Sequence, residues 1–379
     1  MVEILLFVVE GVALLMLGFI VYKLRYAFTN FRIKQQMTPS GVIEEMPGVT
    51  VCIPARNEDH AMIECLERVI KCTYPKLEVL VLDDLSGDDT SNLIKSFASS
   101  GVRFIEGARL PSGWLGKNHA LSELAKEASG TYLFFMDVDT RIRPDTIEQL
   151  VAYAVQENVA MVSVLPRRED GWRGSVLFST LRYFWETVLH HKTAPATASN
   201  AWLIKRSVLM KEFGGLEPFK AAIQPETKLS AALMAQNRYR FLIGTQQLGV
   251  SYEKKWRSQL ATSIRLLFPL LGNNVILSIG AALDLLILFS PSAIVAGGFI
   301  FGWNVPQFIA LGILLASMAA YGAYLSRVWA RGWWLGALLW PVIVLQEVII
   351  LLTSIDRHQR KLVTWKGRKV VSTDTTVSL

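Results

Sequence analysis

Carboxylates follow apolar runs at two places in this 379-residue chain, an arrangement that can bind a cation or a polar ligand. In the segment YLFFMDVDT, residues 132–140, Asp137 and Asp139 come directly after the apolar run. Side chains two residues apart share a face of an extended chain, so both carboxylates can address one cation. Mg²⁺ and Mn²⁺ favour oxygen ligands and typically bind one or two carboxylates together with substrate phosphates. Taken alone, Asp-x-Asp describes a solvated turn after a strand equally well.

Two further polar clusters favour the metal-site interpretation. A second apolar run, residues 79–90 (VLVLDDLSGDDT), ends in Asp83 and Asp84 before a turn. A third, residues 51–58 (VCIPARNE), breaks into a polar turn. In α/β sheets, ligands bind outside the carboxyl ends of the strands, where acidic residues accept hydrogen bonds from a ribose. The three clusters therefore predict a nucleotide site, with Asp83 or Asp84 on the base or the ribose.

Strands and helices must alternate between about residues 49 and 257 to position these clusters. Short β-rich runs predict strands at 49–53, 77–82, 102–105, 132–136 and 159–164. Helical patterns between them predict helices at 60–71, 90–98, 118–128 and 144–156. Such alternation is typical of an α/β domain whose mostly parallel sheet is covered by helices on both faces.

The motifs PARNE (54–58), DDLSGDDT (83–90) and DVD (137–139), in this order, resemble those of glycosyltransferase family 2. The resemblance covers residues 49–256 and implies a GT-A fold, which is a Rossmann-like, mixed and mostly parallel sheet with helices. The segment PSGWLGKNHA (111–120) is similar to the Pro-Gly-Trp-x-Gly-Lys segment of the membrane branch that glycosylates carotenoids, ceramides and related lipids. Members of the family use Mg²⁺ or Mn²⁺, take a nucleotide sugar such as a UDP sugar, and invert the anomeric centre.

The resemblance also assigns roles to residues of this chain. It implies that Asp83 and Asp84 hold the nucleotide, and that Asp139 holds the metal with Asp137 near the ribose and diphosphate. Lys117 would approach the diphosphate as a point charge, or else be an exposed lysine at a helix start. The first polar turn is expected to line the nucleotide-sugar site through Pro54, Arg56 and Glu58.

The second half of the domain departs from the family pattern at one motif. Residues 199–206 (SNAWLIKR) and 213–216 (FGGL) match the expected small-residue loop and Gly-Gly turn. Where a Glu-Asp pair is usual, residues 224–229 read QPETKL, which puts Glu226 at the aspartate position and Pro225 at the glutamate position. A glutamate can still act as the general base on an acceptor hydroxyl, although its extra methylene displaces the carboxylate. We therefore expect Glu226 to be catalytic.

The segment before the last apolar stretch, residues 252–257 (YEKKWR), keeps a tryptophan and basic charge but not the family's Gln/Arg-x-x-Arg-Trp motif. Trp256 can stack on the acceptor or donor while Lys255 or Arg257 neutralises phosphate, or these residues can belong to an interfacial belt. Processive synthases usually keep the full motif, so the departure favours transfer of a single sugar.

Apolar segments flank the α/β domain, and hydrophobic residues make up 51% of the chain. Candidate membrane spans are 4–22, 276–302, 307–325 and 334–353, of which 276–302 is either one tilted helix or a broken hairpin. The net charge of +7 comes largely from basic flanks at 23–34 and 357–369. Their position beside apolar runs suits anionic membrane lipids rather than nucleic acid and places the domain and the tail in the cytoplasm. A cytoplasmic tail needs an even number of crossings after the domain, so we expect a further crossing or a re-entrant segment between residues 259 and 302.

The chain accordingly divides into an anchor (1–24), a basic linker (25–48), a GT-A domain (49–258), interfacial and transmembrane helices (259–355) and a basic, then polar tail (356–379). We expect a multi-pass enzyme of the cell membrane that transfers a sugar to a lipid hydroxyl. Two alternatives remain: a polyprenyl-phosphate sugar transferase, whose acceptor is already a phosphate, and a non-catalytic membrane component that retains the nucleotide fold. The three cysteines form no metal or disulfide pattern, which fits a reducing compartment.

Overall fold

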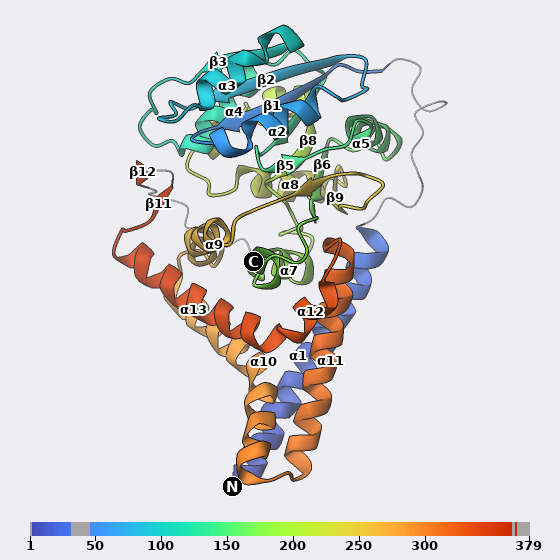
Figure 1. The fold of residues 1–379 in the computed structure, drawn as a ribbon, viewed down its shortest axis with the longest axis vertical. Helices are drawn as coiled ribbons and strands as arrows, with labels where there is room; N and C mark the ends of the chain where they lie inside the picture. Colours follow the sequence, from blue (N-terminus) through green and yellow to red (C-terminus); the bar gives the residue numbers. More distant parts are fainter. Residues whose placement is uncertain (1, 32–45, 366–367, 370–379) are drawn as a thin grey trace.

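The computed structural model describes residues 2–31, 46–365, 368 and 369. A seven-stranded sheet with the order β3-β2-β1-β4-β8-β6-β9 forms the α/β domain at one end of the molecule (Figure 1). Its strands are β1 (Val49–Ala55), β2 (Leu77–Asp83), β3 (Val102–Glu106), β4 (Tyr132–Met136), β6 (Met161–Leu165), β8 (Ala201–Lys205) and β9 (Tyr239–Ile243). Neighbouring strands are parallel except for β8, which is antiparallel to both β4 and β6. The prediction of a mixed, mostly parallel sheet is confirmed.

Helices cover the sheet because its central strands are apolar on both faces; every residue of β4 is buried. The covering helices are α2 (Asp59–Val69), α3 (Thr90–Ser96), α4 (Gly116–Glu127), α5 (Thr146–Gln156) and α8 (Pro225–Ala235). A second sheet with the order β5-β10-β7 lies beside them and consists of β5 (Thr140–Arg141), β10 (Ser251–Tyr252) and β7 (Arg167–Arg168). It brings the segment before residue 256 to the acidic turn at residue 139, where Glu253 N donates to Asp139 O at 3.4 Å.

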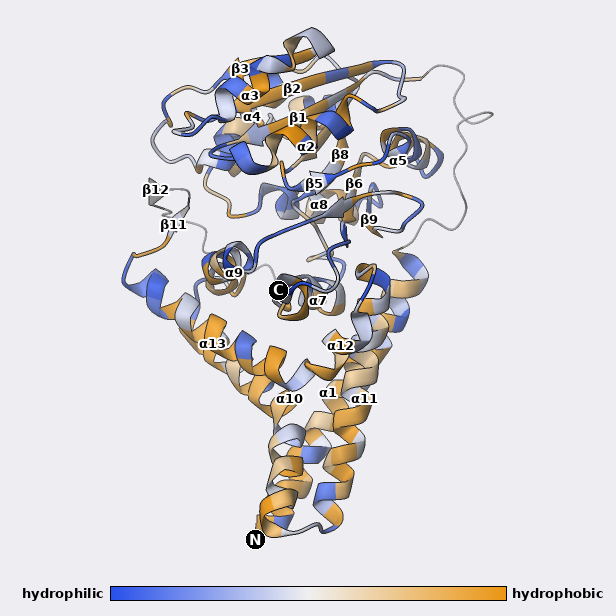
Figure 2. Cartoon of the chain, viewed as in Figure 1, coloured by the Kyte–Doolittle hydropathy of each residue, from blue (hydrophilic) through white to orange (hydrophobic). Residues whose placement is uncertain are grey.

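Three helices of the described residues are long and apolar enough to cross a membrane: α1 (Val2–Asn30), α10 (Val275–Phe301) and α11 (Val305–Val328). They pack together as a bundle that extends away from the domain, and Figure 2 shows them as mostly hydrophobic. Helix α10 continues through Pro291 without a break, so the alternative of a broken hairpin is wrong. Neighbouring helices can satisfy the backbone groups that a proline frees.

The fourth apolar run does not form a single long helix. It splits into α12 (Trp333–Leu338) and α13 (Trp340–Gln359), which lie with α9 (Trp256–Leu270) between the bundle and the domain (Figure 1). The expected further crossing between residues 259 and 302 is also wrong for the described chain, because this stretch forms only α9 and the unbroken α10. Among the described residues, two of the three helices that are long and apolar enough to cross a membrane follow the domain.

The domain and the bundle share one hydrophobic core. Side chains of the sheet and of α4 belong to the same buried cluster as side chains of α1, α10 and α13, including Leu24, Phe135, Leu285 and Ile343. Short helices α6 (Gly174–Leu177) and α7 (Arg182–Val188) lie in the region where these parts meet. The shared core fixes the edge of the sheet relative to the bundle.

Candidate active site

The acidic residues after β4 lie on a tight turn. Thr140 N donates to Asp137 O at 2.9 Å, so residues 137–140 are not extended, and the extended geometry expected for Asp137 and Asp139 is wrong. Asn200 fixes the turn, because its carbonyl accepts from Asp137 N at 3.0 Å and from Thr140 Oγ1 at 3.0 Å. Both carboxylates nevertheless line one cavity.

This cavity, which we call the polar cavity, has a volume of about 790 Å³ and opens at the carboxyl ends of β1, β2 and β4. The structure brings eight predicted site residues to its wall: Pro54, Arg56, Glu58, Asp84, Lys117, Asp137, Asp139 and Trp256. Three others, Asp83, Glu226 and Arg257, lie outside its described lining. The polar cavity is thus where the three polar clusters of the sequence meet, as expected for ligand binding in α/β sheets.

Lysines lie beside both carboxylates of the acidic turn. Lys117 Nζ is 2.5 Å from Asp137 Oδ1, and Lys254 Nζ is 3.7 Å from Asp139 Oδ2. Lys117 begins the first turn of α4, which is tied to the segment before α8 because Asn118 Nδ2 donates to Ala222 O at 2.7 Å. Lys117 is therefore an ion-paired residue of the cavity rather than a solvated lysine at a helix start.

The donor set of the turn fits a hard divalent cation. Asp137 and Asp139 offer carboxylate oxygens, and the described residues contain no cluster of three or more His, Cys, Asp or Glu side chains that would form a complete metal site. A metal held here would need further oxygen ligands from a substrate. Mg²⁺ and Mn²⁺ are commonly bound this way, by one or two carboxylates together with phosphate oxygens.

The loops after β1 and β2 interlock. Arg56 donates to the carbonyl oxygens of Asp84 and Leu85, the latter at 3.0 Å. Asn57 N donates to Ser86 Oγ at 2.9 Å, and Asn57 Oδ1 accepts from Gly87 N at 2.8 Å. These bonds position Glu58 and Asp84 in the wall of the polar cavity.

Asp83 and Asp84 have different environments although they are adjacent. The Asp83 carboxylate is 4% exposed and accepts hydrogen bonds from Ser86 N at 3.3 Å, from Ser86 Oγ, and from Ser91 Oγ at 2.5 Å. The Asp83 carboxylate therefore stabilises the conformation of its own loop. Of the two alternatives in the sequence, Asp84 is the one that lines the polar cavity.

Glu226 lies in the first turn of α8, directly after Pro225, and is 2% exposed. Burial raises the pKa of its carboxyl, while the positive charges of Lys117 and Arg182 oppose that rise. Its neighbour Thr227 lines a second cavity. Glu226 is not among the described lining residues of either cavity, whereas Lys117 lines the polar cavity and Arg182 and Thr227 line the second one.

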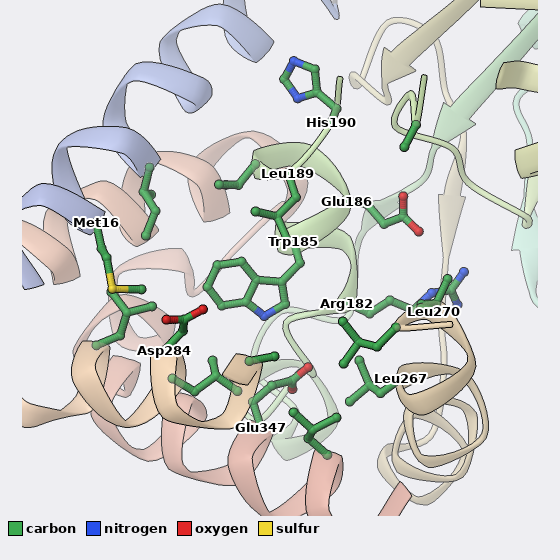
Figure 3. A pocket seen from close by; sticks show the side chains of 18 of the residues that line it. Met16, Arg182, Trp185, Glu186, Leu189, His190, Leu267, Leu270, Asp284 and Glu347 are labelled. Carbon is green, nitrogen blue, oxygen red and sulfur yellow. The ribbon is translucent and has the colours of Figure 1, made fainter. Parts of the chain in front are cut away.

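The second cavity, which we call the apolar cavity, has a volume of about 570 Å³ (Figure 3). Its wall comes from α1, α7, α9, α10 and α13, with Thr227 of α8. Helix α9 lines both cavities: Trp256 and Arg265 face the polar one, and Leu267 and Leu270 the apolar one. No sequence pattern predicts this cavity, because its residues come from distant segments. The charged residues Arg182 and Glu186 within an aromatic stretch were the available signal.

The sheet order, with an acidic turn after the central strand β4, is that of the GT-A fold. Residues 50–213 match the family model Glycosyl transferase family 2, so the chain carries a domain of that family and the resemblance of its motifs is confirmed. The fold is similar to that of a mannosyltransferase from Pyrobaculum calidifontis in complex with GDP-Man and Mn²⁺. That likeness has a TM-score of 0.55 at 19% identity and covers 93% of this chain and 99% of the other.

Curated relatives include 4,4'-diaponeurosporenoate glycosyltransferases of Staphylococcus aureus. The protein of strain bovine RF122 / ET3-1 is 32% identical over 120 residues, which is 31% of this chain and 31% of the relative. The protein of strain USA300 is 31% identical over 120 residues. The chain thus spans about a third of the length of the curated relatives it matches.

Proposed function

We propose that this protein is a membrane-bound, inverting glycosyltransferase that moves one sugar from a nucleotide sugar, such as a UDP sugar, to the hydroxyl of a lipid. One observation carries the proposal. The polar cavity of a family 2 domain and an apolar cavity walled by candidate membrane-spanning helices share helix α9, and Thr227, the neighbour of the buried Glu226, lines the apolar one. The names of the Staphylococcus aureus relatives, which refer to a carotenoid acid, support a lipid acceptor.

On the donor side, the nucleotide would lie along Asp84 and the loop after β1, with its diphosphate towards Lys117 and Asp137. Mg²⁺ or Mn²⁺, held by Asp139 and Asp137, would neutralise the leaving diphosphate. Lys117 contributes a second positive charge at the same place, and Trp256 covers the site from α9.

On the acceptor side, Glu226 takes the proton of the acceptor hydroxyl. The acceptor oxygen then bonds to the anomeric carbon, the bond from that carbon to the diphosphate oxygen breaks, and its electron pair leaves with the nucleoside diphosphate. Burial of Glu226 supports this role, because a raised pKa brings a carboxyl closer to the pH at which it works as a base. Arg182, whose charge reaches Glu226, limits that rise.

The experiment is transfer from a panel of nucleotide sugars to a native lipid extract in the presence of Mn²⁺, with mass spectrometry of the lipids. Glu226→Gln should lower kcat about a hundredfold or more and leave nucleoside diphosphate binding nearly intact. Glu217→Gln, at an exposed glutamate in the same region, is the matched control. Absence of transfer by the wild type with every donor would sink the proposal in favour of a non-catalytic component.

The second candidate is transfer to a polyprenyl phosphate, whose acceptor oxygen needs no base. The near-complete burial of Glu226, outside the described wall of either cavity, favours it. Wild-type turnover in Glu226→Gln together with a sugar-phosphate lipid product would select this candidate over the first.

We further propose a multi-pass protein of the cell membrane, in contact with membrane lipids, whose domain and basic tail lie in the cytoplasm. The turn after α10 lies at the far end of the bundle from the domain (Figure 1). With Cys72 replaced by serine, a cysteine at Asn304 should react with an impermeant thiol reagent in sealed cells, and one at Ser96, on the domain surface, should not. The reverse pattern would refute this orientation.

A further inference from the structure

The apolar cavity lies at the boundary between the catalytic domain and the candidate membrane-spanning helices. Met16 and Phe19 of α1 and Leu285 and Leu288 of α10 supply one side of its wall, and α7 supplies the other. Figure 3 shows the indole of Trp185 in the middle of the cavity, with Met16 on one side of it and Arg182 and Glu186 on the other. A volume of about 570 Å³ falls within the range of small-molecule sites, roughly 300–1,000 Å³.

Three buried polar atoms in this apolar wall have no hydrogen-bond partner among the described residues: Arg182 Nε, Thr227 Oγ1 and Glu347 Oε1. Arg182 is 7% exposed and Glu347 is 1% exposed, so bulk water does not supply their missing hydrogen bonds. The other oxygen of Glu347 accepts from Leu181 N at 3.1 Å, which brings Glu347 beside the start of α7 and hence beside Arg182. Buried polar groups are normally satisfied, so unpaired atoms along one cavity point to a polar ligand group.

The three atoms also specify chemistry. The Arg182 Nε–H can only donate, a Thr227 hydroxyl can donate and accept, and a Glu347 carboxylate oxygen accepts. A hydroxyl group satisfies such a set, because it both donates and accepts, whereas a purely apolar chain leaves every member unpaired. Most of the remaining wall is apolar and suits a hydrocarbon chain, and Glu186, His190 and Asp284 are further polar residues of the wall.

We propose that the apolar cavity is the acceptor site, in which Arg182, Thr227 and Glu347 bind the hydroxyl end of an amphiphile and Trp185 with α1 and α10 encloses its hydrocarbon chain. The inference rests on the proposed function and names where its acceptor binds. Thr227 follows Glu226 directly in the first turn of α8. Burial also raises the pKa of Glu186, in the same wall, to about 7, which supports a neutral, hydrogen-bonding carboxyl beside the acceptor.

Selectivity would come from the polar end of the site. A hydrocarbon chain that moves from the bilayer into the cavity exchanges one apolar environment for another, so this transfer contributes little binding free energy. Binding the hydroxyl, by contrast, satisfies groups that are otherwise unpaired, and such groups discriminate strongly against analogues that lack the partner.

The first test fills the cavity. Ala281→Trp adds an indole to the cavity wall on α10, and Ala293→Trp adds the same group on an exposed face of the same helix. Ala281→Trp should raise the KM for the lipid by about tenfold or more with the Kd for nucleoside diphosphate unchanged, and Ala293→Trp should change neither. Equal acceptor KM values in both variants and the wild type would overturn the acceptor site while leaving the proposed function standing.

The second test does not depend on transfer. Hexadecanol with a mid-chain diazirine is photolysed with the full-length protein in vesicles, and labelled peptides are identified by mass spectrometry. Labelling should concentrate on the peptides that contain Trp185 and Leu285 and should fall in Ala281→Trp and in Thr227→Val. Hexadecane carrying the same diazirine should not be enriched there. Labelling spread evenly over the outer faces of α1, α10 and α11, as for bulk lipid, would overturn the proposal even if the protein transfers sugar.

Discussion

Asp83 offers a test that separates a residue that binds the nucleotide from one that shapes the loop around it. The family resemblance assigns Asp83 to the nucleotide, whereas the structure shows its carboxylate accepting three hydrogen bonds within its own loop. Asp83→Ala removes both acceptor oxygens and with them all three hydrogen bonds. The serines that remain, Ser86 and Ser91, can regain only part of their bonding from water.

The magnitude follows from these bonds. A hydrogen bond to a charged group contributes about 1.5–3 kcal/mol, but bonds within one network are not additive. Because the serines are partly accessible, we expect a loss of about 3 kcal/mol rather than the full sum. For a domain of this size each kcal/mol lowers Tm by about 2–4 °C, so Asp83→Ala should melt roughly 6–12 °C lower. Donor affinity should fall too, because the loop also holds Asn57 through Ser86.

The assay combines thermal unfolding in detergent, at one fixed scan rate, with titration of UDP and GDP in Mn²⁺. Asp83→Asn is the informative control, because its amide oxygen keeps an acceptor and should recover most of the Tm. If Asp83→Ala instead keeps the wild-type Tm and loses only nucleotide affinity, Asp83 contacts the donor directly and the structural argument fails.

Three other perturbations have defined outcomes. Asp139→Asn should abolish transfer, as should EDTA, because the leaving diphosphate loses its counter-charge; full activity in EDTA would exclude the metal. Gly107→Ala should weaken donor binding without touching the donor, since its Cβ would lie 2.6 Å from Asp83 O, and Gly87→Ala, with open space around it, should not. Burial raises the pKa of Glu186 from 4.5 to about 7, so the stability it contributes is complete below pH 4.5 and lost as pH rises through about 7. The wild-type Tm should therefore fall between pH 5 and pH 8 by more than that of Glu186→Gln, and parallel curves would show that Glu186 titrates normally.

Local sequence predicted the first half of the sheet well, because each of its strands is an apolar run bounded by turn residues. The strand β4 has the predicted bounds, Tyr132–Met136, and β1 and β2 extend their predictions by one or two residues. Strands β8 and β9 were not predicted. Strand β8 joins the sheet in the antiparallel sense between two distant partners, a pairing that no local pattern records.

The membrane region shows a different limit. An apolar run of about twenty residues describes a lipid-facing helix and a buried helix equally well. Helix α13 combines the two kinds. Ile343 and Val344 pack in the core shared with the domain, whereas Val342, Ile349 and Leu352 on the other face are exposed. Only part of its apolar residues therefore reflects packing against α9 and α10.

The two cavities also differ in how far the sequence predicts them. Residues that line the polar cavity follow strand ends, and parallel strands bring their carboxyl ends to one edge, so their proximity is a consequence of topology. The apolar cavity draws Met16, Arg182, Leu267 and Glu347 from segments separated by most of the chain. Its existence depends on how the bundle docks on the domain, and this information is not present in any motif.

The departure at Pro225 and Glu226 gains a physical interpretation from the structure. Proline suits the first position of α8, and Glu226 in that first turn gains from the helix dipole. The glutamate usual at position 225 is lost, because proline takes its place at the start of the helix. In the wall of the apolar cavity, burial raises the pKa of the Glu186 carboxyl of α7 to about 7, and the charge of Glu226 adds a smaller contribution.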